Sequence, residues 1–144
     1  MRKIFLKSSL ILLSVYALMG LTAQAQADTT STTITFVNAT SSNISLLMKP
    51  NLSGSLSPEA PQTITTTNPS VTLFSETSGD MDGGTIYYGT CRFNWSTVKN
   101  VDPMTGMVSW TFSQLPATSS SCSAIATTAN YSTGAHAIIF TVKK

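Results

Sequence analysis

Few side chains of this protein are of the types that catalyse reactions, and none of them belongs to a recognisable catalytic motif. The chain has one histidine, His136, in an alternating run with Ile138 and Phe140. A Ser-His-Asp triad needs the histidine beside a nucleophile, and no Gly-x-Ser-x-Gly sequence marks one. We therefore expect His136 to be packed in a strand or at a strand edge, and we predict no catalytic residue.

One acidic segment has the beginning of a metal-binding pattern. Asp80-Met81-Asp82-Gly83-Gly84 places carboxylates at alternate positions before glycines, as a calcium loop does. The bidentate glutamate that completes such a loop is missing. Asp80 and Asp82 are therefore a calcium candidate, but we favour a glycine-rich turn over a calcium site. One histidine and two cysteines do not supply a usual zinc site, and no cofactor motif is present.

The two cysteines, Cys91 and Cys122, are the clearest chemical signal in the sequence. Thiols exported to an oxidising compartment normally pair, so we expect a disulfide between them. Their spacing is unlike the Cys-x-x-Cys of redox proteins, which favours a structural bridge.

Export is indicated by the first 27 residues, which have the organisation of a bacterial-type signal peptide. Basic residues precede an apolar run over positions 10–21, and alanines at 23, 25 and 27 allow cleavage after Ala25 or, as we prefer, Ala27. The run is shorter than the roughly 20 residues of a membrane-spanning helix, and no later stretch reaches that length. We expect one domain over residues 28–144, secreted or periplasmic, with no transmembrane segment.

Charge excludes one class of partner. Three of the eight basic residues lie in the predicted signal peptide, which leaves five bases against six acids in the remaining chain. Nucleic-acid binding requires a basic surface, so we expect no nucleic-acid partner.

The elements that must position these residues are predicted to be strands. Threonine, serine, valine and isoleucine dominate from residue 28 onward, and short runs alternate apolar and polar residues between turn signals. We expect an all-β fold, an antiparallel β-sandwich or jelly roll of about seven or eight strands with one disulfide. The first two strands, 32–38 and 43–49, are expected to form a hairpin.

The segment from Thr85 to Val98 is predicted to be one central strand. Period two then places Tyr87, Gly89, Cys91, Phe93 and Trp95 on the core face. Tyr88 and Arg92 lie on the opposite face, where an exposed aromatic ring and a guanidinium group would form a binding patch.

Several kinds of exported protein have similar features. Sandwiches of this size with one disulfide and a threonine-rich surface resemble pilin and spore-coat subunits, whose groove accepts a strand from a neighbour. Those families place one cysteine in the first strand, whereas Cys91 and Cys122 both lie in the second half, so no family is assigned. Phe36-Val37-Asn38 before a Ser/Thr run, with the segment from Cys91 to Trp95, is similar to aegerolysins, small secreted lipid-binding sandwiches.

Three functions are compatible with these observations. We favour a non-enzymatic extracellular or periplasmic binding or surface module whose ligand is a glycan, a lipid or a protein. A pilin-like structural subunit would have an incomplete fold, a free hydrophobic groove and heat-resistant oligomers. A membrane-active or hydrolytic effector would expose aromatic side chains on loops.

Overall fold

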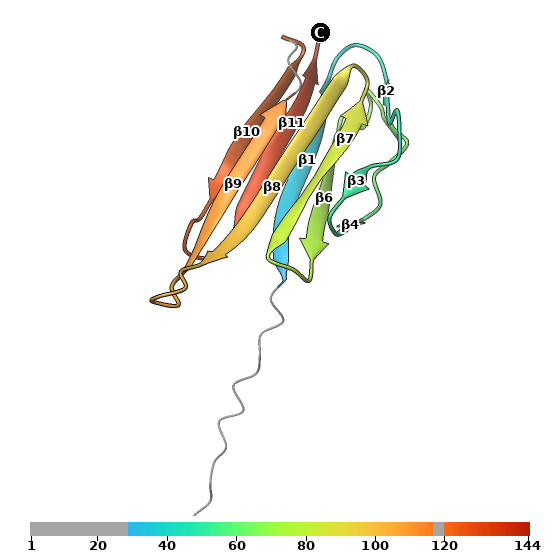
Figure 1. Ribbon diagram of the computed structural model, residues 1–144. Coiled ribbons are helices and arrows are strands. Elements are labelled where there is room, and N and C mark those ends of the chain that lie inside the picture. Colours follow the sequence, from blue (N-terminus) through green and yellow to red (C-terminus); the bar gives the residue numbers. More distant parts are fainter. Residues whose placement is uncertain (1–28, 117–119) are drawn as a thin grey trace, which may run out of the picture.

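The computed structural model describes residues 29–116 and 120–144, and the predicted signal peptide over residues 1–27 lies outside them. The described residues form strands and no helix, as Figure 1 shows. The strands are β1 (Thr30–Ala39), β2 (Ile44–Ser45), β3 (Asn51–Leu52), β4 (Ser55–Ser57), β5 (Thr63–Ile64), β6 (Ser70–Thr77), β7 (Met81–Tyr88), β8 (Cys91–Val101), β9 (Val108–Pro116), β10 (Cys122–Ala129) and β11 (His136–Lys143).

The strands form two facing layers, so the predicted all-β sandwich is confirmed (Figure 1). One sheet has the order β10-β11-β1-β6-β4 and the other has the order β3-β7-β8-β9, with β2 and β5 as a separate pair. In the described part of the chain, no helix is long and apolar enough to cross a membrane.

Strand β1 lies inside the larger sheet and is paired along both edges. It runs parallel to β11, with Thr32 opposite His136 and Phe36 opposite Phe140, and antiparallel to β6, with Ile34 opposite Leu73. The expected hairpin between the first two strands is therefore wrong. A short turn after β1 leads the chain out of this sheet, and Ile44 of β2 pairs with Ile64 of β5 instead.

Aromatic rings from both sheets fill the core. The ring centroids of Phe93 and Phe140 are 4.7 Å apart, those of Phe36 and Phe140 5.5 Å, and those of Phe36 and Tyr88 5.1 Å. Trp95 packs at the end of this cluster, 6.4 Å from the Phe140 ring. Because β1, β7, β8 and β11 each contribute a ring, burial of this apolar surface holds the two layers together.

The predicted central strand is two strands joined by a tight turn, so the single strand over 85–98 is wrong. Tyr88 pairs with Cys91, which leaves Gly89 and Thr90 as a two-residue hairpin loop. Gly89 has a φ of 56°, the positive value that the first loop residue of a type II′ turn requires. Residues that face each other across a hairpin share a face of the sheet, so Tyr88 joins Cys91, Phe93 and Trp95 in the core.

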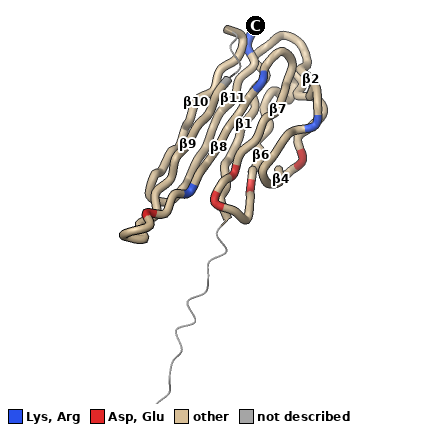
Figure 2. The backbone as a smooth tube through the Cα atoms, in the orientation of Figure 1, with Lys and Arg blue, Asp and Glu red and all other residues tan. Residues whose placement is uncertain are grey.

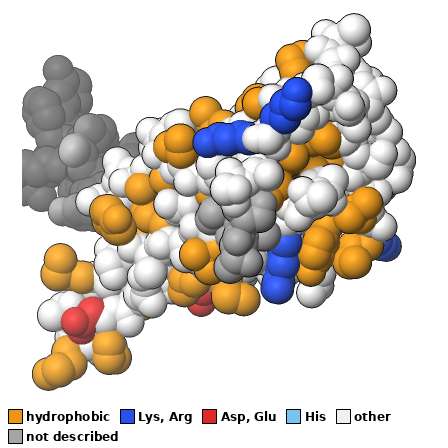
Figure 3. Space-filling model, turned by 90° about the horizontal axis from the view of Figure 1, so that it is seen from above, with side chains coloured by type: hydrophobic (Ala, Val, Ile, Leu, Met, Phe, Trp, Pro, Cys, Tyr) orange, Lys and Arg blue, Asp and Glu red, His pale blue; other side chains and the backbone are white. Residues whose placement is uncertain are grey.

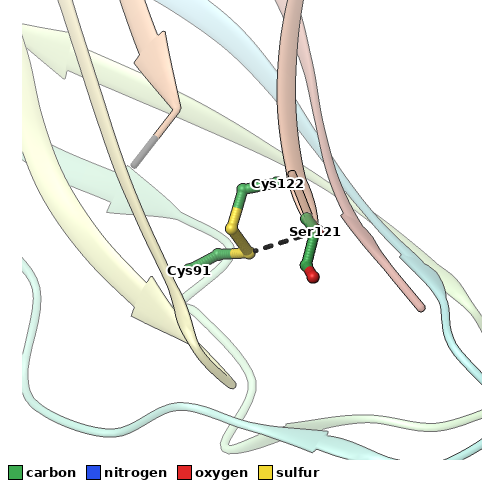
Figure 4. Close-up of a disulfide and its surroundings, with 3 residues drawn as sticks. All are labelled: Cys91, Ser121 and Cys122. Atoms are coloured by element: carbon green, nitrogen blue, oxygen red, sulfur yellow. Dashed lines mark hydrogen bonds between the residues drawn. A yellow bond between two sulfur atoms is a disulfide. The ribbon is translucent and has the colours of Figure 1, made fainter. Parts of the chain in front are cut away.

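The expected disulfide is present and joins the two sheets. Cys91 begins β8 and Cys122 begins β10, and their Cα atoms are 5.7 Å apart. Both cysteines are buried, and the Ser121 carbonyl oxygen lies 3.6 Å from Cys91 Sγ (Figure 4). This is a packing contact, because a disulfide sulfur has no proton to donate.

Replacing both cysteines, as Cys91→Ala with Cys122→Ala, should destabilise the fold. The bridge closes a loop with a sequence separation of 31, which in the chain-entropy model is worth about 3 to 4 kcal/mol. Urea unfolding followed by fluorescence should show this loss, and the reduced wild type should match the variant. Equal midpoints for oxidised wild type and variant would contradict a stabilising bridge.

Candidate functional site

The predicted Tyr88 and Arg92 patch is not formed. Tyr88 has no exposed surface, and its hydroxyl donates a 2.7 Å hydrogen bond to the Pro61 carbonyl oxygen. Burial raises the pKa of its phenol. Arg92 is exposed on the other side of the sheet, where its guanidinium carbon lies 6.0 Å from the centroid of the Tyr87 ring. Tyr88 is therefore an anchor for the segment around Pro61 and not a contact residue.

The calcium candidate is also separated by the fold. Asp82 lies within β7 with no exposed surface, and Oδ1 of its carboxylate accepts a 2.7 Å hydrogen bond from the Ser75 hydroxyl. Asp80 is exposed before that strand begins. The glycine-rich turn expected at Asp80 to Gly84 is wrong, because Met81 to Gly84 belong to β7 and pair with β8. No group of three metal-ligating side chains occurs within residues 29–116 and 120–144.

His136 and Asp82 belong to polar groups that are buried between the sheets. His136 Nδ1 lies 2.8 Å from the Thr97 hydroxyl, which lies 2.8 Å from the Thr32 hydroxyl. His136 is therefore packed inside a strand, as expected, and its hydrogen-bond partner is a threonine on the opposite sheet. These bonds join β1, β8 and β11, while the bond between Ser75 and Asp82 joins β6 and β7. The arrangement links strands of both sheets.

Burial shifts the two titratable groups in opposite directions. It lowers the pKa of His136 from 6.5 to about 4, so the imidazole is neutral when the protein is folded. Burial raises the pKa of Asp82, and the hydrogen bond from Ser75 opposes this increase. Asp82 Oδ2 and His136 Nε2 have no hydrogen-bond partner among the described residues, so an ionised form of either group is destabilising at this position.

His136 should make the protein less stable in acid. Between pH 6.5 and about 4 the histidine takes up a proton in the unfolded chain and not in the folded one, which costs up to about 3 kcal/mol. Urea unfolding at several pH values should show His136→Gln losing less stability than wild type as the pH falls across this window. An unchanged pH slope in His136→Gln would contradict this assignment.

Asp82 should have the opposite effect, because its folded pKa is raised and ionisation is favoured in the unfolded chain. Asp82→Asn keeps an acceptor for the Ser75 hydroxyl and removes the buried charge. The variant should be more stable than wild type at pH 7, and this advantage should shrink as the pH falls and Asp82 becomes protonated. A stability loss at pH 7 would show that the carboxylate is stabilised by its surroundings.

Two loops at one end of the sandwich have the same turn. In the β8–β9 loop, Asp102 Oδ1 accepts hydrogen bonds from the backbone N–H groups of Met104 and Thr105, and Gly106 N–H donates to the Asp102 carbonyl oxygen. In the β10–β11 loop, Asn130 makes the equivalent bonds with Ser132, Thr133 and Gly134. Both glycines have positive φ, 69° and 76°. These bonds make each loop a defined structure.

The turn end, which we define as residues 101–108 and 130–134, carries the three most exposed large apolar side chains among the described residues. Met104 is 93% exposed and Met107 is 70% exposed, and Val101 and Val108 flank them on the paired strands. Tyr131, at 64%, is exposed on the second loop. Figure 3 shows hydrophobic side chains gathered on a lobe that projects from the body of the molecule. Such a concentration of apolar surface is typical of a contact site.

Packing of the second loop against β9 holds the turn end in place. Trp110 N–H donates to the Tyr131 carbonyl oxygen, and the Phe112 and Tyr131 rings are 5.3 Å apart. A Cβ atom on Gly134 would lie 2.5 Å from the Trp110 ring, so only glycine allows this close approach. The second loop is thereby fixed against β9, beside the first.

A hollow lies beside the other end of β8. We define it by residues 46–50 and 59–62, which enclose about 410 Å³. Leu46 forms a bridge with Tyr88, and the Tyr88 hydroxyl holds Pro61 from the other side. Leu47 and Met48 are more than half exposed at this hollow. A second hollow, over Gly83 on β7 and β8, is lined by apolar side chains such as Leu52 and Met81 and by polar ones such as Ser96, which is hydrogen-bonded to Ser113.

Sequence reasoning missed the turn end, although a signal was present. Asp102-Pro-Met-Thr-Gly106 and Asn130-Tyr-Ser-Thr-Gly134 share an acceptor side chain, a threonine and a glycine at the same spacing. Comparison of the chain with models of known protein families and with curated proteins finds no match.

Proposed function

We propose that this chain is an exported, non-enzymatic surface module that binds a protein partner through its turn end. The observation that carries the proposal is the exposure of Met104 and Met107 on a loop whose backbone is held by Asp102. Apolar side chains exposed to this extent are energetically unfavourable in water, and a partner that covers them removes this cost.

The structure of the loops favours binding over a passive surface role. Loops that are ordered before binding lose little conformational entropy when a partner covers them. Methionine adapts its unbranched side chain to irregular surfaces, and Tyr131 adds an aromatic ring with a polar tip. Charged residues are sparse at the turn end, where Asp102 is the single carboxylate within residues 101–108 and 130–134.

The test is retention on the surface of the producing cells. Medium, periplasm and washed cells are separated, and the protein in each is measured by immunoblot for wild type and for Met104→Ser with Met107→Ser. We expect the double variant to move into the soluble fractions, with retention reduced at least about tenfold, because one buried methionine is worth about 1.5 kcal/mol or more.

A matched control comes from two other exposed apolar residues. Leu115 and Ile125 are each 60% exposed but lie on strands β9 and β10, outside the turn end. Leu115→Ser with Ile125→Ser should leave retention unchanged. Equal loss of retention in both double variants, or no loss in either, would overturn the proposal. If wild type binds phospholipid vesicles and Met104→Ser with Met107→Ser does not, the membrane-active effector is favoured instead.

A second candidate function, the structural subunit, is supported by the position of β1. This strand follows the predicted signal peptide, is connected to the rest of the domain on one side only, and is paired along both edges. The described sheet has no open groove at this position, because β1 fills it. Assembly would therefore require β1 to leave its own sheet and enter that of a neighbour, which preserves every native pairing.

Locking β1 in its own chain tests this candidate. The Thr35 and Thr72 hydroxyl oxygens are 3.0 Å apart across β1 and β6, so Thr35→Cys with Thr72→Cys places two thiols within disulfide reach. If subunits exchange β1, the wild type should give heat-resistant oligomers on unboiled, non-reducing gels and the oxidised double variant should be monomeric. The same oligomers in both proteins would exclude exchange of β1.

A further inference from the structure

We propose that the partner of the turn end is the hollow of a second copy of this chain, so that copies join head to tail. This inference rests on the proposed function and names the partner of the same surface. Two surfaces carry it: the protruding methionines of one end, and the concave apolar surface formed by Leu47, Met48 and Ala60 at the other.

The shapes of the two surfaces are compatible. Met104 and Met107 belong to the loop between β8 and β9. This loop projects from the sandwich, as Figure 1 shows. The hollow encloses about 410 Å³, and a cavity of about 150 Å³ is already large enough for benzene. An unbranched methionine side chain therefore fits with room to spare, and its entry would cover Leu47 and Met48 as well as itself.

The charges at the two ends are complementary. Asp102 is the charged residue of the turn end, and Lys49 lines the hollow together with Glu59. Figure 2 shows an acidic and a basic residue near each other at both ends of the molecule. Asp102 of one copy can therefore pair with Lys49 of a neighbour. The near balance of five bases and six acids after residue 27 keeps repulsion between copies small.

The positions of the two surfaces determine the kind of assembly. The turn end follows the last residue of β8, whereas Leu46 at the hollow pairs with Tyr88, next to the first residues of β8. The strand has 11 residues, which separates the surfaces by roughly 35 Å. In a head-to-tail arrangement each copy uses its turn end on one neighbour and its hollow on another. A contact of this heterologous kind continues from copy to copy and produces a chain or a closed ring.

Sedimentation of the full protein over a range of concentrations tests the proposal. Wild type should form a series of oligomers that grow with concentration, whereas Met104→Asp and Leu47→Asp should each remain monomeric. A mixture of these two variants should form dimers and nothing larger, because one intact turn end and one intact hollow remain. Leu115→Asp is the matched control on β9 and should behave as wild type.

The charge pairing has a separate test. Asp102→Asn keeps the acceptor that holds the turn, as Asn130 does in the second loop, and removes only the charge. We expect it to weaken association about tenfold and to reduce its salt dependence, with Lys49→Gln giving a similar loss.

The outcomes separate this inference from the proposed function. If turn-end variants lose cell retention while wild type stays monomeric at every concentration, the partner is another protein and the head-to-tail contact is wrong. If wild type assembles but the mixture of Met104→Asp and Leu47→Asp gives no dimer, the assembly uses other surfaces. If retention does not depend on the methionines, the proposed function itself fails.

Discussion

The pairing of β1 along both of its edges is the constraint on which the sandwich depends. Without β1 the larger sheet would divide between β11 and β6, and the core would lose Ile34 and Phe36. Because β1 is parallel to β11 and antiparallel to β6, the first and last strands of the described chain meet in the centre of one sheet. Such contacts are distant in sequence and form only when the whole chain has collapsed.

The interior combines aromatic packing with buried polar side chains. The aromatic cluster supplies the apolar burial that opposes chain entropy, while Thr32, Thr97 and His136 use hydrogen bonds to align strands of the two sheets. Asp82 and the neutral His136 are less favourable, because burial opposes the charged form of each. The disulfide between β8 and β10 offsets part of this cost at the far end of the sandwich.

The two ends of the molecule differ in a way that suits contact with a partner. One end has two loops whose backbone is held by Asp102 and Asn130, and its methionines project into solvent. The other end is concave, and the hydrogen bond from the Tyr88 hydroxyl to the Pro61 carbonyl oxygen fixes the segment that lines it. The strands between them carry many hydroxyl side chains, and the most exposed apolar side chains, Met104, Met107 and Tyr131, lie in the loops of one end.

Alternation and composition were enough to predict the all-β sandwich, the core positions of Phe93 and Trp95, and the bond between Cys91 and Cys122, because these depend on local period and on residue type. The partner of each strand was decided by tertiary structure, since β1 could satisfy its ladder with any neighbour of suitable register. The sheet face on which Tyr88 lies was decided by one turn, because the two-residue loop at Gly89 changes which residues share a face. Alternation of residue types alone does not indicate where a strand folds back. The turn end and the hollow likewise exist only in three dimensions, because each joins segments that are separated along the chain.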